Sequence, residues 1–458
     1  MIEYRNLRVA LLGAGSVGSQ VARLLLSQGD EFASRIGARL ELVGIAVRDV
    51  DAPRDVELPR ELFTTDASSL ILGADIVVEL MGGVEPARGY VLEALNSGAD
   101  VITANKALLA THGPELFEAA EQVGAQLYYE AAVAGAIPII RPLRDSLAGD
   151  RINRILGIVN GTTNFVLDRM DVNGETLQDA LATATDRGYA EADPTADIGG
   201  YDAAQKAAIL ASLAFHTTVP LDRVYREGIT SVDKAQVDAA REAGAVIKLL
   251  AICERLTDPE TGEEGVSARV YPALISREHP LAAVHGAHNA VFVQSAAAGD
   301  LMFYGAGAGG VETASAVLGD VVSAARRHVV GGPGVAESTH AGIPVLDIGR
   351  VVTRYQITLD VEDQPGVLAA VARILSDGGV SVETVQQSVP SSHTGPVVIA
   401  GNADLAAGLP IHGGATPTAT LVIGTHEAEE AALAATVEAL AASDVVIAIS
   451  SVLRVEGS

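Results

Sequence analysis

The chain has 458 residues, of which 48% are hydrophobic but only 4% are aromatic. This length favours two to four domains at roughly 150 residues each, and cores poor in aromatic residues are typical of helix-covered parallel sheets, so we expect an α/β fold. The formal net charge of −27 repels phosphate backbones and anionic lipid, which excludes nucleic acid and membranes as expected partners.

A strand followed by a glycine-rich turn opens the chain. The apolar run Leu7 to Leu12 precedes the sequence Gly13-Ala-Gly-Ser-Val-Gly18, and apolar residues at helical spacing continue to Gly29. A strand, a G-x-G-x-x-G turn and a helix in this order are typical of a dinucleotide-binding fold, in which the pyrophosphate lies on the helix N-terminus. The candidate cofactor-binding residues in this turn are Gly13, Gly15, Ser16, Val17 and Gly18.

The end of the second expected strand, 40–47, bears on the choice of cofactor. A basic residue there would accept the 2′-phosphate of NADP, whereas an acidic residue would select NAD. Arg48 comes first and Asp49 second. We therefore expect NADP, with NAD as the alternative.

A later strand, 100–103, ends in Thr103 and leads to Lys106. Ligands of open parallel sheets bind at the carboxyl ends of the strands, so both residues are candidates for the cofactor crevice. The alternative for Lys106 is a solvated lysine at the start of a helix. A second G-x-G-x-x-G, at Gly305, Gly307 and Gly310, lacks the strand-helix-strand context and is interpreted as a loop before a helix over 313–327.

Glu130 is followed by a turn of small residues that ends at Pro138. A carboxylate and several carbonyl groups within a few residues are the oxygen ligands that alkali and alkaline-earth cations prefer. The alternative is a buried or capped acid.

The segment 160–206 is rich in groups that bind or titrate. It contains the sequence Asn160-Gly-Thr-Thr-Asn164 and several carboxylates, among them Glu191, and ends at Lys206. A helix is predicted from Asp202 onward, so Asp202 and Lys206, four residues apart, lie on one face and place an acid and a base in one patch. The alternative is an ordinary solvated salt bridge.

We expect three domains and a linker: a Rossmann nucleotide-binding domain in 1–135 with about 305–330, an α+β catalytic and dimerisation domain with an open sheet in 136–304, a linker in 331–352 and a third domain in 353–458. The strands expected in the middle domain are 154–159, 266–273, 290–294 and 300–304, and its helices are 176–188, 202–215 and 234–255. In the last domain strands at 355–361, 380–389, 397–400, 419–425 and 445–452 with helices after 363–368 and over 427–442 indicate the β-α-β-β-α-β order of a ferredoxin-like fold.

One cysteine, Cys253, excludes an intrachain disulfide and a multi-cysteine metal site. No apolar run approaches the roughly 18 residues needed to cross a bilayer, so we expect a cytoplasmic protein.

Taken together, these motifs resemble the homoserine dehydrogenase family, in its single-function form with a C-terminal ACT domain. The resemblance covers the whole chain, and no kinase-like segment of the fused aspartokinase form is expected. The motifs that carry it are Gly13–Gly18, Thr103–Lys106, Glu130–Pro138, Asn160–Asn164, Gly188–Pro194, Asp202–Lys206, Tyr304–Gly309 and Asp363–Leu368.

The resemblance implies an NAD(P)-dependent oxidoreductase of threonine and methionine biosynthesis, which reversibly reduces the small molecule aspartate 4-semialdehyde to homoserine. It assigns the proton transfer to Lys206 with help from Lys106, and substrate binding to Glu191 and Asp202. Further assignments place Gly188 and Gly307 near the nicotinamide and a sodium ion at Glu130, Val133, Gly135 and Ile137.

The resemblance also implies regulation and assembly. A homodimer or homotetramer is expected, and threonine is the expected effector, bound at Asp363 and Gly366 of the ACT domain. Two alternatives remain: a nonenzymatic nucleotide sensor, which would not need Lys106 and Lys206 together, and another amino-acid dehydrogenase, which would not need the sequence 160–164.

Overall fold

The computed structural model describes residues 5–257, 261–332, 334, 337, 341–388 and 418–457. By its contacts the chain divides into two compact units, Met1–Pro272 with Ser276–Leu346 and Ala273–Ile275 with Asp347–Ser458. None of the helices that the structure describes is long and apolar enough to cross a membrane.

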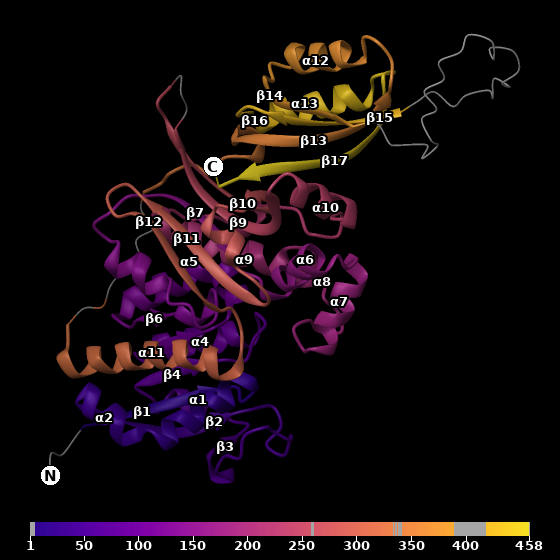
Figure 1. Ribbon diagram of the computed structural model, residues 1–458. Coiled ribbons are helices and arrows are strands. Elements are labelled where there is room, and N and C mark those ends of the chain that lie inside the picture. Colours follow the sequence, from indigo (N-terminus) through magenta and orange to yellow (C-terminus); the bar gives the residue numbers. More distant parts are fainter. Residues whose placement is uncertain are drawn as a thin grey trace, which may run out of the picture. The chain divides into compact units, whose positions relative to one another are not determined.

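A parallel sheet of six strands forms the first part of the larger unit (Figure 1). Its strands are β1 Arg5–Leu12, β2 Ala38–Ala46, β3 Phe63–Thr64, β4 Ile76–Glu79, β5 Asp100–Thr103 and β6 Leu127–Tyr128. They run in the order β3-β2-β1-β4-β5-β6, which is that of a Rossmann sheet. The direction of winding reverses between β1 and β4, so a ligand crevice is expected at the carboxyl ends of the central strands.

Helices cover this sheet. As a consequence, β4 and β5 are buried along their whole length. The helices are α1 Ser16–Ser27, α2 Gly29–Ile36, α3 Ala67–Ile71, α4 Ala87–Asn96, α5 Lys106–Val123 and, much later in the chain, α11 Gly310–Val330. In α11, Ala314, Val317 and Val321 share a core with Val9 and Leu11 of β1. The helix therefore packs beside α1 despite its distance in the sequence (Figure 1).

A second, mixed sheet follows in the larger unit, with the order β12-β11-β7-β9-β10. Its strands are β7 Ile152–Ile158, β9 Ala245–Thr257, β10 Glu264–Ser276, β11 His288–Ser295 and β12 Gly299–Ala306, and the short β8 Tyr225–Arg226 pairs with β10. The accompanying helices are α6 Gly161–Asn173, α7 Leu177–Asp186, α8 Thr195–Ile198, α9 Tyr201–Phe215 and α10 Lys234–Glu242. Since α9 packs against both α5 and β9, it is buried on nearly all sides.

The prediction of one helix over 234–255 is wrong in its second half. The structure ends α10 at Glu242, turns at Gly244 in the left-handed region (φ 71°) and continues as β9. Residues Val246 to Cys253 are all buried in this strand. A continuous apolar run cannot be assigned to a helix or a buried strand by periodicity alone, so only the glycine marked the boundary.

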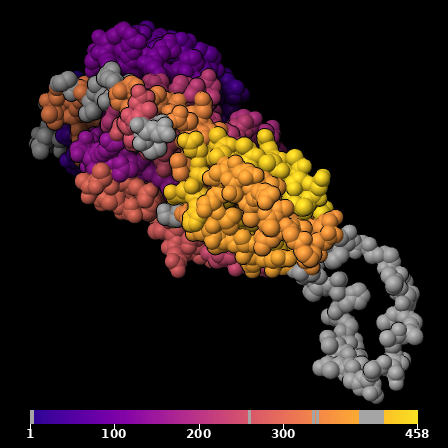
Figure 2. Space-filling view, turned by 90° about the horizontal axis from the view of Figure 1, so that it is seen from above, coloured from indigo at the N-terminus to yellow at the C-terminus, as the bar shows by residue number. Residues whose placement is uncertain are grey.

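The smaller unit has the β-α-β-β-α-β order of a ferredoxin-like fold, which confirms that prediction. Its elements are β13 Val352–Glu362, α12 Val367–Asp377, β14 Val382–Ser388, β15 Thr418–Thr425, β16 Ala428–Glu429, α13 Glu430–Ala441 and β17 Val446–Glu456. Alternate residues of β13, such as Tyr355 and Ile357, face one core with Val371 of α12 and Leu433 of α13. The unit is the orange and yellow body in Figure 2. The expected strand 397–400 lies outside the described residues.

Candidate active site

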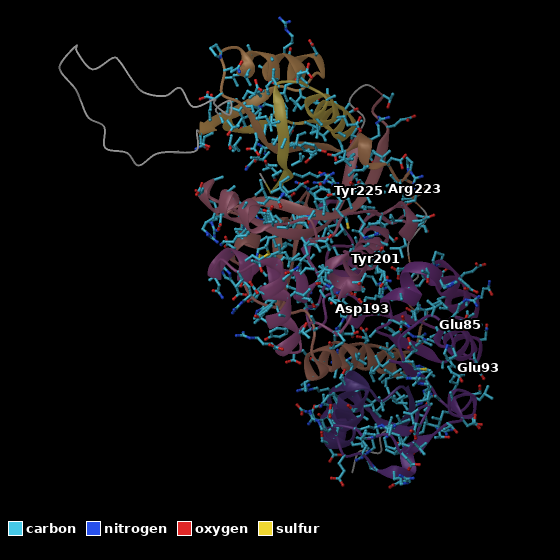
Figure 3. All side chains as sticks on the ribbon, turned by 90° about the vertical axis from the view of Figure 1, so that its right-hand side faces the viewer. Glu85, Glu93, Asp193, Tyr201, Arg223 and Tyr225 are labelled. Carbon is cyan, nitrogen blue, oxygen red and sulfur yellow. The ribbon has the colours of Figure 1, made fainter. Side chains whose placement is uncertain are left out.

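The larger unit contains a cavity of about 370 Å³ at the carboxyl ends of β4 and β5. One wall is formed by the turns that follow these strands, and the other by the segment that leads into α9. Polar groups and glycines in the two walls are Gly82, Gly83, Asn105, Lys106, Glu191, Asp193, Asp197, Tyr201, Asp202 and Gln205. Asp193 and Tyr201 are labelled in Figure 3. The cavity thus brings Lys106 together with Glu191 and Asp202, which lie in one segment much later in the chain.

Asp202 lies between two lysines. Its Oδ1 is 3.1 Å from Nζ of Lys106, and its Oδ2 accepts a hydrogen bond of 2.7 Å from Nζ of Lys206. The side chains of Asp202 and Lys206 are each only 11% exposed, whereas that of Lys106 is 40% exposed. The alternative of an ordinary solvated salt bridge is therefore wrong for the pair on α9.

The charge of Asp202 is fixed by these neighbours. Burial raises the pKa of this carboxyl, but the positive charges of Lys206 and Lys106 and the hydrogen bonds from Lys206 and Asn160 outweigh burial and lower the pKa to about 2. Asp202 is therefore ionised at neutral pH and can accept hydrogen bonds from an ammonium or a hydroxyl group of a ligand.

Lys206 has one donor left for a ligand. Its ammonium group donates 2.6 Å to the carbonyl oxygen of Val159 and 2.7 Å to Asp202. An ammonium group has three N–H donors, so these contacts with described residues use two of them. The third forms no contact with a described residue. Lys206 is not among the residues that line the cavity, and it is connected to the cavity wall through its hydrogen bond to Asp202.

Asn160 connects several parts of the site, although no individual role was predicted for it. Its Oδ1 accepts a hydrogen bond of 2.8 Å from the backbone N–H of Thr163, which caps α6. Its Nδ2 donates 2.7 Å to Asp197 and 2.9 Å to Asp202. These partners are 37 and 42 residues away in the chain, so no local pattern could have indicated them.

Glu79, at the end of β4, was also missed. Its buried carboxylate accepts hydrogen bonds from the hydroxyl of Thr103 (2.6 Å) and the backbone N–H of Met81 (2.7 Å). Asn105 extends this network, because its Nδ2 donates 2.6 Å to the carbonyl oxygen of Gly83. The network holds the turn after β4 at the cavity. An acidic residue at the end of a buried strand was the one signal in the sequence.

The glycines of the first turn differ in the space around them. A Cβ atom on Gly13 (φ 101°) would lie 2.7 Å from the carbonyl oxygen of Leu80, and one on Gly18 would lie 2.2 Å from that of Gly13. Gly15 in contrast has no atom within 4 Å of its Cβ position. Gly13 and Gly18 are therefore needed for packing, while Gly15 leaves open space beside Ser16 and Val17, which begin α1.

Arg48 follows the end of β2 and is exposed. Its guanidinium group forms no hydrogen bond or ion pair with any described residue. The next basic residue, Arg54, donates to the carbonyl oxygens of Asp49 and Ala52 and lies 4.3 Å over the ring of Phe63. Of these two arginines, only Arg48 is free to bind a ligand.

The second glycine loop lies against the first one. A Cβ atom on Gly310 would be 2.9 Å from the carbonyl oxygen of Ser16, and one on Gly307 would be 2.1 Å from the side chain of Asn289. Gly307 also touches the loop after Glu130, since a Cβ atom on Gly135 would be 2.4 Å from the carbonyl oxygen of Gly307. Such close approaches require glycine at these positions.

Glu130 is buried, and hydrogen-bond donors surround its carboxylate, as in the alternative of a capped acid. Its carboxylate accepts hydrogen bonds from the backbone N–H groups of Ile139 (2.6 Å), Ile140 (2.8 Å) and Arg141 (2.9 Å), and from Nε of Arg141 (2.9 Å). Both oxygens of the carboxylate thus have hydrogen-bond donors, and the cation site expected at Glu130 stays a prediction.

The remaining candidates lie in three places. Glu191 lines the cavity, whereas Gly188 (φ 74°) lies in the turn after α7, outside the cavity lining. In the smaller unit, Asp363 and Gly366 (φ 97°) form the turn that starts α12.

A larger cavity, about 740 Å³, shares Tyr201 and Gln205 with the first one. Apolar residues of α5 and α9, such as Leu109, Phe117 and Leu213, line most of it. Neither Lys106 nor Lys206 lines it, whereas Lys106 and Asp202 line the smaller cavity, so the smaller cavity is the candidate active site.

A Rossmann crevice that ends in a lysine-carboxylate cluster defines the class of protein, a nicotinamide-dependent oxidoreductase of a small polar substrate. The family models of known proteins agree with this class. That of the homoserine dehydrogenase NAD-binding domain matches residues 13–130, that of homoserine dehydrogenase matches 138–322, and that of the ACT domain matches 355–404.

Individual relatives match over nearly the full length. A homoserine dehydrogenase of Corynebacterium glutamicum is 52% identical over 450 residues, which covers 98% of this chain and 95% of the relative. The crystal structure of a homoserine dehydrogenase from Thiobacillus denitrificans has a TM-score of 0.87 at 36% identity and covers 100% and 99% of the two chains. A hyperthermophilic archaeal homoserine dehydrogenase, solved in complex with NADPH, has a TM-score of 0.59 at 27% identity, with 72% and 99% covered.

The chain belongs to the homoserine dehydrogenase family. It is an oxidoreductase that acts on the CH–OH group of homoserine with a nicotinamide cofactor, and it carries an ACT domain. This confirms the resemblance, fold class and activity expected from the sequence.

Proposed function

We propose that the cluster of Lys106, Asp202 and Lys206 is the catalytic centre for hydride transfer between the nicotinamide and aspartate 4-semialdehyde. The observation that carries the proposal is the position of Asp202, within 3.1 Å of Lys106 and 2.7 Å of Lys206 at the edge of the cavity. When hydride reaches the aldehyde carbon, the carbonyl oxygen becomes an alkoxide that needs a proton within hydrogen-bond reach. Lys206 supplies it from its third N–H, and takes it back when homoserine is oxidised.

The other cavity residues have binding roles in this proposal. Glu191 and Asp202 are carboxylates at the cavity, and they bind the ammonium and hydroxyl ends of the amino acid. Lys106, on the first turn of α5, assists at the end of the crevice where the cofactor enters.

The test is the substitution Lys206→Ala. We expect kcat to fall by about 10²–10⁴-fold, because this is the usual contribution of a general acid, while the dissociation constant for NADPH stays within about twofold. Lys234→Ala, which removes an exposed lysine from α10, is the matched control and should leave kcat unchanged. A Lys206→Ala enzyme that keeps more than about a tenth of kcat would exclude this role.

For the cofactor we propose NADP, bound with its pyrophosphate at Gly13, Gly15, Ser16, Val17 and Gly18. The unpaired Arg48 supports the choice, because a 2′-phosphate needs a cation at this end of β2. Thr103, Lys106, Gly188 and Gly307 are proposed contacts with the rest of the cofactor. The NADPH complex of the archaeal relative is consistent with this assignment.

We also propose a sodium ion in the loop after Glu130, where Glu130 and the carbonyl oxygens of Val133, Gly135 and Ile137 would hold it. The loop bends sharply at Ala134 (φ 60°) and Gly135 (φ 57°), and carbonyl oxygens suit a hard cation. The ion would fix the loop that touches Gly307.

At the level of domains we propose the division into 1–135 with about 305–330, 136–304, a linker at 331–352 and 353–458. The boundary between the two compact units, at Leu346 and Asp347, falls within the proposed linker. A homodimer or homotetramer is proposed because the edge strand β12 exposes Tyr304 (55%) and Met302 (36%). Threonine is the proposed effector of the ACT domain.

A further inference from the structure

The orientation of the Asn160 amide is determined by its neighbours. The backbone N–H of Thr163 can only donate, so the atom that faces it at 2.8 Å must be Oδ1. The NH2 group therefore faces the two carboxylates, with Asp197 at 2.7 Å and Asp202 at 2.9 Å. Asn160 itself is only 6% exposed, so its amide group is shielded from solvent behind the two carboxylates that line the cavity.

Two carboxylates thus share one nitrogen atom in the wall of the substrate cavity. Like charges this close repel each other. Asp202 has Lys106 and Lys206 as counter-charges, but Asp197 forms no ion pair with any described residue. The NH2 group of Asn160 donates to both carboxylates. It therefore connects Asp197, which has no counter-charge among the described residues, to Asp202, which has two.

The end of β7 also holds the proposed acid. Val159, which precedes Asn160, accepts the 2.6 Å hydrogen bond from Lys206 through its carbonyl oxygen. Two consecutive residues therefore form hydrogen bonds with Lys206, Asp202 and Asp197. The strand reaches this position because β7 lies between β11 and β9 in the sheet.

We propose that Asn160 is a positioning residue for the substrate: its NH2 group sets the spacing of Asp197 and Asp202, so that both carboxylates face the polar groups of the amino acid. This inference rests on the proposed function of the Lys106, Asp202 and Lys206 cluster. The competing explanation is that Asn160 serves only as the N-cap of α6.

Asn160→Ser separates the two explanations. Serine is as good an N-cap as asparagine, so the cap on Thr163 is kept, but the side chain is too short for its hydroxyl to bridge both carboxylates. Thr176→Ala is the matched control, because it removes the N-cap of α7, where Thr176 accepts a hydrogen bond of 3.2 Å from the backbone N–H of Asp179, away from the cavity lining.

We expect Asn160→Ser to lower kcat/KM for homoserine about tenfold or more, mainly through KM, since hydrogen bonds to charged groups are lost. The dissociation constant of NADPH should stay within about twofold, and the Tm should fall less than in Thr176→Ala, which in turn should leave KM for homoserine unchanged. A value of kcat/KM within about twofold of the parent enzyme, or a parallel loss of NADPH affinity, would overturn the proposal.

A double-mutant cycle gives a second measurement. Asp197→Asn removes the uncompensated charge, so the effect of Asn160→Ser on KM should be smaller in the Asp197→Asn background by about fivefold or more. Additive effects would show that the two residues act independently and would contradict the bridge. If Lys206→Ala retains activity, the proposed function fails instead, whatever the Asn160 variants show.

Discussion

At the scale of single residues, the chemistry of the site depends on which charged side chains already have partners. Asp202 is held by two lysines, and Lys206 keeps one N–H for a ligand. Partners also distinguish the arginines near the end of β2. Arg54 donates hydrogen bonds to backbone carbonyl oxygens, and Arg60 forms an ion pair with Asp51. Arg48 alone among these three arginines is unpaired within the described structure.

Arg48→Ala should therefore change the cofactor preference. We expect KM for NADPH to rise about 10- to 100-fold, the usual cost of losing a hydrogen bond to a charged group, and KM for NADH to stay within about twofold. The comparison requires steady-state kinetics with both cofactors. Arg39→Ala, an exposed arginine at the opposite end of β2, is the control. Equal losses for the two cofactors would show that Arg48 does not bind the 2′-phosphate.

The sequence predicted some residues of the site but not others, for a physical reason. The pair Asp202 and Lys206 could be predicted because the period of a helix places residues four apart on one face. The hydrogen bond from Asn160 to Asp197 joins residues 37 positions apart. The hydrogen bond from Thr103 to Glu79 joins two neighbouring strands, β5 and β4. Such contacts depend on the packing of separate elements, which local patterns do not contain.

At the scale of elements, the glycine turn shows how a helix is docked on a sheet. Gly18 brings α1 within contact of the backbone at Gly13, whereas Gly15 faces open space. The two glycines of one motif therefore have different roles, one in packing and one in leaving room for a ligand.

Substitutions at these glycines should separate stability from cofactor binding. Gly18→Ala should lower the Tm by several degrees, because the new Cβ atom would lie 2.2 Å from the carbonyl oxygen of Gly13 and the backbone must shift. Gly15→Ala should keep the Tm nearly unchanged and weaken NADPH binding about tenfold or more, since a methyl group enters the space of the pyrophosphate. Thermal unfolding of the apo enzyme and cofactor titration measure the two effects. Equal Tm losses in both variants would contradict this division.

The elements themselves were predictable to different degrees. The strands and helices of the Rossmann sheet and the ferredoxin-like order of the C-terminal unit follow from periodicity and turn residues. The buried strand β9 was mistaken for helix, because its apolar run has no alternation to distinguish the two.

At the scale of the whole molecule, the ACT domain forms a separate unit without any of the catalytic groups proposed here. An effector bound there can act only if it binds the less active state of the enzyme more tightly than the active state. The start of α12 suits an amino acid, since the free backbone N–H groups at a helix N-terminus bind a carboxylate and Asp363 can bind an ammonium group.

Asp363→Asn and Gly366→Ala in the full-length enzyme should abolish inhibition by threonine and leave the activity without effector unchanged. The alanine is expected to disturb the turn, because Gly366 has φ 97°, a conformation that residues with a Cβ atom rarely adopt. Asp377→Asn, at the other end of α12, is the matched control and should keep the inhibition. The measurement is a threonine titration of NADPH oxidation with aspartate 4-semialdehyde. If the parent enzyme shows no inhibition at millimolar threonine, the ACT domain does not regulate through this amino acid, and a role in holding subunits together becomes the better explanation of its presence.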